Sequence, residues 1–169
     1  MAYPKDKFPT QFIDQILDEC VGSDIFSFMD DFSEYNHVQI KLEDEHKTSF
    51  ICPFGTFSYR KIPFYLKNNG ATFHQDMTFS FHDLKHIIKF CLDDLPSHSQ
   101  LRLHHLDHLH LVFERCHRYQ IRLNPKMCIF FVRDGWLLGF IVSKDEIRVD
   151  SQNFVEILGL YVSRAITHL

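Results

Sequence analysis

The amino-acid sequence predicts an α+β domain with a mainly antiparallel sheet and helices packed on one face of it. Three segments repeat apolar residues at the spacing of amphipathic helices. Between them lie short apolar segments that alternate with polar residues or end at turn-forming residues, which is typical of strands. There is no internal repeat, low-complexity segment or linker, so residues 1–169 are expected to form a single domain. The order is helix, strands, helix, acidic strand, helix and hairpin, which is typical of α+β domains.

The composition is that of a folded domain in a reducing compartment. Hydrophobic residues make up 45% of the chain and aromatic residues 15%, enough for a substantial core. The five cysteines are scattered without a C-x-x-C pair, which argues against a disulfide framework and a cysteine zinc site. No apolar run is long enough to span a bilayer, and the first residues lack the apolar segment of a signal peptide. We therefore expect an intracellular protein, cytoplasmic or nuclear, that is neither secreted nor membrane-bound.

The net charge of −4 does not by itself indicate a nucleic-acid-binding protein. Phosphate contacts need only a few basic side chains on one face, so local clusters could still bind. Two candidate clusters are Arg115, Arg118, Arg122 and Lys126, and Arg60, Lys61 and Lys67. On sequence grounds, a solvated surface is the favoured interpretation of both.

The first half of the chain predicts one helix and several strands. Residues 11–21 form the helix, and a glycine ends it. The strand that follows ends in Asp30, and residues 38–42 alternate as a half-buried strand would. Residues 50–64 predict two further strands about a turn at Cys52-Pro53-Phe54-Gly55, because proline and glycine favour turns.

The second half predicts two helices. Residues 71–82 carry apolar side chains four apart, and residues 100–119 form the longest helical pattern, with Ser99 as its N-cap. We expect the longer helix to bury Leu106, Leu109, Phe113 and Cys116. His104 and His108 share one of its faces, but no thiolate or carboxylate is fixed beside them, so an ordinary helix surface is favoured over a zinc site.

Two apolar strands, residues 129–132 and 136–142, flank Arg133-Asp134-Gly135. The Asp-Gly pair predicts a hairpin turn between these strands. From Ser151 onward the chain carries further apolar residues at helical spacing, which predicts the start of another helix.

Asp93 and Asp94 follow an apolar strand predicted at residues 87–92. Taken alone, such a pair is a hairpin turn, since Asp tolerates turn dihedrals and bonds to its own backbone. The strand that ends in Asp30 provides a second acidic strand end, and the three carboxylates would converge if the two strands are neighbours. An oxygen-rich site of this kind suits Mg²⁺ or Mn²⁺ and is typical of two-metal phosphoryl transfer.

Short motifs along almost the whole chain support this interpretation. They include Tyr3-Pro4-Lys5-Asp6-Lys7-Phe8-Pro9, Phe28-Met29-Asp30, Cys52-Pro53-Phe54-Gly55-Thr56-Phe57, Leu66-Lys67-Asn68-Asn69-Gly70-Ala71-Thr72-Phe73, Leu123-Asn124-Pro125 and Leu138-Gly139-Phe140-Ile141-Val142-Ser143. In this order and spacing, the chain resembles the reverse transcriptase domain of gypsy-type LTR retrotransposons, particularly the plant members. The resemblance implies the palm of an RNA-directed DNA polymerase, with part of the fingers at about residues 38–67.

The resemblance also implies a metal centre and its substrates. Asp30 and Asp93 would bridge two Mg²⁺ ions, with Mn²⁺ as a possible substitute. Asp94 would be the nearby third acid, and the backbone carbonyl of Asp31 a further ligand. The ions would activate the primer 3′-hydroxyl for attack on a deoxynucleoside triphosphate, with an RNA template and a DNA primer as partners.

Further positions carry over from the resemblance to substrate binding. The nucleotide would lie against Asp31, Phe32, Tyr35, Phe64 and Tyr65, and the template and primer against Lys67, Gly70, Leu138 and Gly139. Tyr35 matches the aromatic gate beneath the sugar that excludes a 2′-hydroxyl, and a core aromatic at a strand end is the alternative. Gly139 would lie in the hairpin that grips the primer, and a small residue in a crowded strand is the alternative.

Some residues depart from the family pattern at the site itself. Tyr65 replaces a glycine, and its ring is expected to obstruct the nucleotide pocket. Pro96 and Ser97 replace aliphatic strand residues, Cys91 replaces an aromatic residue and Met127 a lysine. Since proline lacks a backbone donor, we expect the return strand after the acid pair to be weakened.

We also expect the N-terminal fingers, thumb, RNase H and integrase segments of such polyproteins to be absent. The chain is therefore expected to be a truncated reverse transcriptase with weak or no polymerase activity alone. The alternative is an inactive palm-like remnant that at most binds nucleic acid or a partner protein. A metal-dependent phosphoesterase built on the same acids is a third hypothesis, supported only by those acids.

Overall fold

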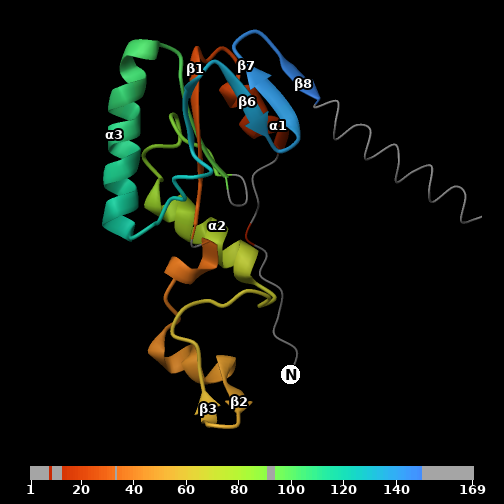
Figure 1. The fold of residues 1–169 in the computed structure, drawn as a ribbon, viewed down its shortest axis with the longest axis vertical. Helices are drawn as coiled ribbons and strands as arrows, with labels where there is room; N and C mark the ends of the chain where they lie inside the picture. Colours follow the sequence, from red (N-terminus) through yellow and green to blue (C-terminus); the bar gives the residue numbers. More distant parts are fainter. Residues whose placement is uncertain (1–7, 9–12, 33, 91–93, 150–169) are drawn as a thin grey trace, which may run out of the picture.

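The computed structural model describes residues 8, 13–32, 34–90 and 94–149 (Figure 1). Its elements are α1 (Ile13–Cys20), β1 (Ile25–Asp30), the 3-10 helices η1 (Glu34–His37) and η2 (Leu42–Thr48), β2 (Phe50–Cys52), β3 (Gly55–Phe57), α2 (Asn69–Ser80), β4 (Asp94–Ser99), α3 (Arg102–Tyr119), β5 (Ile129–Val132), β6 (Asp134–Leu137), β7 (Phe140–Ser143) and β8 (Ile147–Val149). Within these residues, no helix is both long enough and apolar enough to cross a bilayer. The three predicted helices are confirmed as α1, α2 and α3, with ends that differ from the predicted ones by up to two residues.

β1 is the central strand of the main sheet, whose order is β4-β1-β5. Both of its neighbours run antiparallel to it, and the register with β4 extends from Ile25 opposite Ser99 to Asp30 opposite Asp94. The other strands form a β2–β3 pair and a β6-β7-β8 sheet, and these pairings are antiparallel too. The predicted α+β class with a mainly antiparallel sheet is therefore confirmed.

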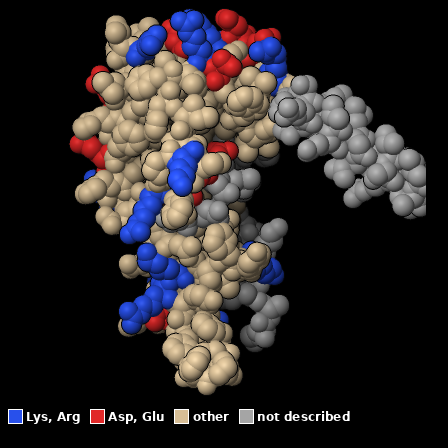
Figure 2. Space-filling view, viewed as in Figure 1, with Lys and Arg blue, Asp and Glu red and all other residues tan. Residues whose placement is uncertain are grey.

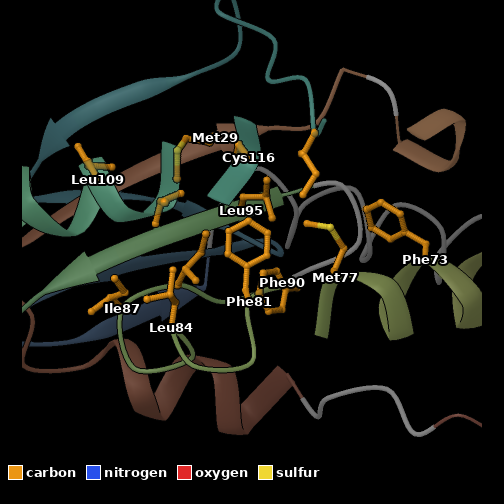
Figure 3. Close-up of a cluster of buried hydrophobic side chains, with 13 residues drawn as sticks. Met29, Phe73, Met77, Phe81, Leu84, Ile87, Phe90, Leu95, Leu109 and Cys116 are labelled. Carbon is orange, nitrogen blue, oxygen red and sulfur yellow. The ribbon is translucent and has the colours of Figure 1, made fainter. Parts of the chain in front are cut away.

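The larger core lies between the main sheet, α2 and α3 (Figure 3). Its buried side chains are Met29, Phe73, Met77, Phe81, Leu84, Ile87, Ile88, Phe90, Leu95, Leu109, Val112, Cys116 and Ile121. α2 and α3 thus contribute to one core cluster with β1 and β4, whereas α1 belongs to a second cluster with β1, β6 and β7. That cluster consists of Ile16, Leu17, Cys20, Phe26, Leu137 and Val142.

The strand predicted at residues 38–42 is wrong. Only Gln39 forms a bridge, to Lys61, and the 3-10 helix η2 begins at Leu42. A run of only five alternating residues is too short to distinguish a strand from a 3-10 helix, and Leu42 is exposed rather than buried. The hairpin predicted after it is confirmed, although β2 and β3 are only three residues long each.

Asp94 lies at the start of β4 rather than at the end of a strand, which corrects the prediction for this acid. Of the strand predicted at residues 87–92, residues 87–90 form only an isolated bridge, at Ile88, and the rest lies outside the described residues. Residues 87–90 pair irregularly with β4. Lys89 donates its N–H to the carbonyl of Pro96 (2.9 Å), and the carbonyl of Ile87 accepts from the N–H of His98 (3.0 Å). Because the carbonyl of Pro96 faces this segment, its nitrogen faces it too, away from β1. The β1–β4 ladder therefore needs no donor from Pro96, and the missing N–H affects only the side of β4 that faces residues 87–90.

The buried face of α3 also differs from the prediction. Leu109 and Cys116 are buried as predicted, but Leu106 and Phe113 are exposed, and His105 and Val112 are buried in their place. The reason is the polarity of the sheet beneath it, which presents the hydroxyls of Ser27 and Ser99 to His105. Ser99 is the last residue of β4, so it is not the N-cap of the helix.

The predicted hairpin turn at Asp134-Gly135 is wrong as well. β5 pairs with β1, and the two-residue turn falls at Leu138 and Gly139, between β6 and β7. Both turn residues have positive φ angles (52° and 84°), as two-residue hairpin turns require. Gly135 lies within β6, buried against the ring of Phe28. The helix predicted from Ser151 onward lies outside the described residues.

Candidate active site

The main sheet brings two acidic residues together at one end. Asp30 ends β1 and Asp94 begins β4, and the two are directly opposite in the antiparallel register. Residues opposite each other in this way project from the same face of a sheet with their Cβ atoms about 5 Å apart. We call this pair the acidic edge. Asp93, the other acid of the predicted set, lies outside the described residues.

Two carboxylates placed opposite each other repel, which destabilises the strand pair unless a cation or hydrogen-bond donors compensate. Asn124 supplies one donor, because its side-chain amide lies 3.3 Å from Oδ2 of Asp30. The backbone N–H of Asn124 also donates to the carbonyl of Asp30 (2.9 Å), and that of Phe32 to the carbonyl of Arg122 (2.8 Å). The loop after α3 therefore holds the end of β1. Asn124 belongs to the motif Leu123-Asn124-Pro125, but no local pattern in the sequence predicts its contact with Asp30.

Asp31 follows Asp30 but is buried and faces different partners. Its Oδ2 lies 3.6 Å from Nδ1 of His37, and Nε2 of that imidazole lies 3.1 Å from Oδ2 of Asp76 on α2. The carboxylate of Asp31 is thus directed into the protein, toward η1 and α2.

The predicted nucleotide-binding aromatics gather beside the end of β1. Tyr35, in η1, is half-buried, and its ring packs edge-on against Phe64 (centroids 5.5 Å apart) and Phe73 (5.4 Å). Phe32 and Tyr65 are exposed. Tyr65 has a φ of 71°, in the left-handed region that favours glycine, and its ring centroid lies 6.4 Å from that of Phe64.

The residues predicted to contact template and primer lie on separate elements. Lys67 precedes α2, and Gly70 lies in the first turn of that helix; both are exposed. Leu138 and Gly139 form the β6–β7 turn and are half-buried. Gly139 thus provides a positive-φ turn residue, rather than the small strand residue considered as its alternative.

The predicted basic clusters are only partly available to a ligand. Arg115 donates two hydrogen bonds to the carboxylate of Asp83 (2.7 and 2.8 Å) and one to the carbonyl of Ser80 (2.6 Å). These bonds fasten α3 to the end of α2, and the guanidinium lowers the pKa of Asp83 to about 2. In Figure 2 the basic side chains lie in several separate groups rather than in one continuous patch.

The histidines of α3 form a polar layer against the sheet. His105 is fully buried, and its nitrogens lie 2.7 Å from Oγ of Ser27 and 2.8 Å from Oγ of Ser99. Ser99 also contacts Nδ1 of His108 (2.7 Å). Burial lowers the pKa of His105 to about 4, and burial together with the nearby Lys89 lowers that of His98 to about 4. These histidines are therefore neutral structural groups near neutral pH.

Among the described residues, no three His, Cys, Asp or Glu side chains are grouped as metal ligands. This holds for the histidines of α3, where the rings of His104 and His108 lie 6.4 Å apart. The acidic edge contributes two carboxylates, and Asp93 lies outside the described residues. The donor set of that edge is entirely oxygen, which is the chemistry that Mg²⁺ and Mn²⁺ prefer.

Comparison with known sequences gives a consistent result. The family model described as "Reverse transcriptase (RNA-dependent DNA polymerase)" matches residues 2–162. The chain is 30% identical over 150 residues to the retrovirus-related Pol polyprotein from transposon 412 of Drosophila melanogaster, covering 88% of this chain and 12% of that protein. It is 26% identical over 153 residues to the transposon Tf2-3 polyprotein of Schizosaccharomyces pombe, covering 89% and 11%. The chain thus spans only a small part of these relatives.

Solved structures agree on the fold. The foamy viral protease-reverse transcriptase in complex with an RNA/DNA hybrid superposes with a TM-score of 0.77 at 19% identity, covering 88% of this chain and 20% of that one. A second foamy viral structure, in complex with double-stranded DNA, gives a TM-score of 0.78 at 19% identity, covering 88% and 26%. At this identity the likeness establishes the palm and fingers architecture.

Proposed function

Because the chain belongs to the reverse transcriptase (RNA-dependent DNA polymerase) family, we propose that it is the palm, with part of the fingers at about residues 38–67, of a retrotransposon RNA-directed DNA polymerase. The observation that carries this proposal is the acidic edge, where Asp30 and Asp94 meet at the ends of two paired strands. The proposed partners are an RNA template, a DNA primer and deoxynucleoside triphosphates. Within this family, we place the chain among gypsy-type, plant-like elements on the motifs quoted above.

In the proposed centre, Asp30, Asp93 and Asp94 would hold two Mg²⁺ ions through their carboxylates, and Asp31 through its backbone carbonyl. When bound, such ions favour deprotonation of the primer 3′-hydroxyl and stabilise the charge on the transferred phosphoryl group. The repulsion between Asp30 and Asp94 supports this assignment, because a divalent cation would relieve it.

Other residues would bind and orient the nucleotide. Tyr35 would lie beneath the sugar, and its ring, held edge-on by Phe64 and Phe73, would exclude a 2′-hydroxyl. The exposed Phe32 and Tyr65 would border the base and the phosphates. Template and primer would lie along Lys67 and Gly70 and along the turn formed by Leu138 and Gly139.

We expect slow synthesis of short products from this chain on its own. Tyr65 places a phenol ring where the resembled enzymes have glycine, so the nucleotide meets an obstacle. The alternative is a catalytically inactive palm that at most binds nucleic acid or a partner protein. Retention of the oxygen donors at the acidic edge favours activity over the inactive form.

Primer extension on an RNA template with Mg²⁺ or Mn²⁺ tests the proposal. We expect addition of one or a few nucleotides, and a loss of at least about 100-fold in Asp30→Asn and Asp93→Asn, since such ions contribute several kcal/mol to the transition state. Asp107→Asn, a change of an exposed acid on α3, is the matched control and should retain full activity. Circular dichroism should show every variant folded.

The outcomes separate the two candidates. Extension by the parent and the control, with loss in both site variants, supports the polymerase. No extension from a folded parent overturns the polymerase and leaves the inactive palm. Long, processive products would contradict the expected obstruction by Tyr65.

A further inference from the structure

The imidazole of His37 lies between Asp31, the residue after β1, and Asp76 on α2. It ends η1, and its side chain is only 4% exposed. Nε2 lies 3.1 Å from Oδ2 of Asp76 on α2, within hydrogen-bonding distance. Nδ1 lies 3.6 Å from Oδ2 of the buried Asp31, a close approach that is beyond hydrogen-bonding distance.

The same imidazole belongs to the aromatic cluster around Tyr35. Its ring packs edge-on against Phe73 (centroids 5.6 Å apart), and Phe73 packs edge-on against Tyr35 (5.4 Å). Tyr35 and His37 are two residues apart in a single turn of 3-10 helix. The contacts of His37 therefore restrict both the backbone that carries Tyr35 and one of the rings that surround it.

We infer that His37 is a positioning residue: by bonding to Asp76 of α2 and packing against Asp31 and Phe73, it fixes η1 so that the Tyr35 ring stays where the sugar of the nucleotide would lie. This inference rests on the proposed function for its consequence in catalysis, but its structural part stands on the contacts alone. Loss of these contacts frees the turn to move relative to α2. With the Tyr35 ring displaced, the nucleotide site then accepts a ribonucleotide more easily and binds the deoxynucleotide less well.

Kinetics of single-nucleotide addition test the consequence. We expect His37→Ala and Asp76→Ala to raise the KM for the deoxynucleotide about tenfold and to lower the preference for it over the ribonucleotide about tenfold, with a smaller change in kcat. His37→Gln, which keeps a donor for Asp76, and Asp76→Asn, which keeps an acceptor for His37, should be intermediate. A purely structural role would lower the active fraction, and hence kcat, while leaving KM and sugar preference unchanged.

The matched control is His110→Ala. His110 also lies beside a carboxylate, with Nε2 3.3 Å from Oε1 of Glu114, but that pair is exposed on α3. Removing it should change neither KM nor sugar preference. An equal effect of His110→Ala would overturn the inference.

A second measurement does not depend on catalysis. Nuclear Overhauser contacts between the ring of Tyr35 and the rings of Phe64 and Phe73 should be present in the parent and in His110→Ala, and weakened in His37→Ala and Asp76→Ala. Unchanged contacts in both of these variants would overturn the inference. If the folded parent adds no nucleotide, the proposed function fails, while the ring contacts still decide whether His37 positions Tyr35.

Discussion

Tyr65 holds a backbone conformation that its side chain disfavours. Its φ of 71° lies in the left-handed region, and its ring is fully exposed, so burial offsets little of the cost. A non-glycine residue in this region destabilises the folded state by roughly 1–2 kcal/mol. Glycine removes this strain, but the greater flexibility of its unfolded chain offsets part of the gain. We expect Tyr65→Gly to raise the free energy of unfolding by about 0.5–1 kcal/mol.

The control for this prediction is Tyr65→Ala, which removes the ring but keeps the Cβ atom. It should leave stability close to that of the parent. Urea unfolding followed by circular dichroism measures all three chains. If alanine stabilised the protein as much as glycine, the exposed ring would be the cause and not the backbone.

His98 and His105 make stability depend on pH. Both have folded-state pKa values of about 4, lowered by burial from an ordinary 6.5, so the unfolded chain binds more protons between these values. Their contribution to stability is complete above pH 6.5 and is lost as the pH falls to 4. We expect a combined loss of at least about 3 kcal/mol over this range.

Urea unfolding at several pH values measures this loss, and NMR titration of the two imidazoles identifies its source. The Asp83 carboxyl, whose pKa is about 2, is ionised in the folded state throughout this window and titrates below it. A stability that stayed constant from pH 6.5 to 4.5 would rule out buried neutral histidines.

At the scale of elements, the sequence predicted helices better than strands. A helix such as α3 repeats its pattern over several turns, whereas the segment 38–42 offers too few residues to separate a strand from a 3-10 turn. The buried face of α3 was predicted only in part, with Leu109 and Cys116 correct, because hydropathy describes only the helix. Whether His105 or Leu106 is buried depends on the hydroxyls that Ser27 and Ser99 present from distant strands.

The β6–β7 hairpin carries two glycines with different roles. Gly139 serves the turn through its positive φ, while Gly135 leaves room for a neighbouring side chain. A methyl group at Gly135 would overlap the ring of Phe28, so one of the two must shift. We expect Gly135→Ala to destabilise the protein by about 1–3 kcal/mol, the usual cost of overpacking a core.

A compensating change distinguishes overpacking from a backbone effect. Phe28→Leu shortens the side chain that a Cβ at Gly135 would meet. The double variant should therefore be less destabilised than the sum of the two single variants, as thermal unfolding would show. Strict additivity would mean that the ring of Phe28 is not the obstacle.

At the scale of the whole molecule, the candidate site was predicted in part. Two acidic strand ends imply a shared site only if their strands are neighbours, and the opposition of Asp30 and Asp94 meets that condition. The contacts of His37 with Asp31 and Asp76 were beyond prediction, because they join the residue after β1, a 3-10 turn and a helix whose packing no local pattern encodes. The order of motifs, rather than any one motif, identified the family.

The tip formed by β2 and β3 carries few Lys, Arg, Asp or Glu side chains (Figure 2), whereas the neighbouring η2 carries Glu43, Asp44, Glu45 and Lys47. Leu42, Ile51 and Phe54 are 85%, 86% and 91% exposed. Clustered apolar side chains on short strands favour association between copies of a chain. We therefore expect the purified chain to self-associate, with a sedimentation coefficient that rises with concentration.

The double variant Ile51→Lys with Phe54→Lys should sediment as a monomer at the same concentrations, with an unchanged melting temperature because both side chains are already exposed. Leu103→Lys is the matched control: Leu103 is 87% exposed, but it lies on α3, far along the chain from the β2–β3 hairpin. If Leu103→Lys also dissolved the association, any added charge would suffice and the hairpin would not be the contact. If only the double variant became monomeric, the apolar surface of the β2–β3 hairpin would be the contact between copies of the chain.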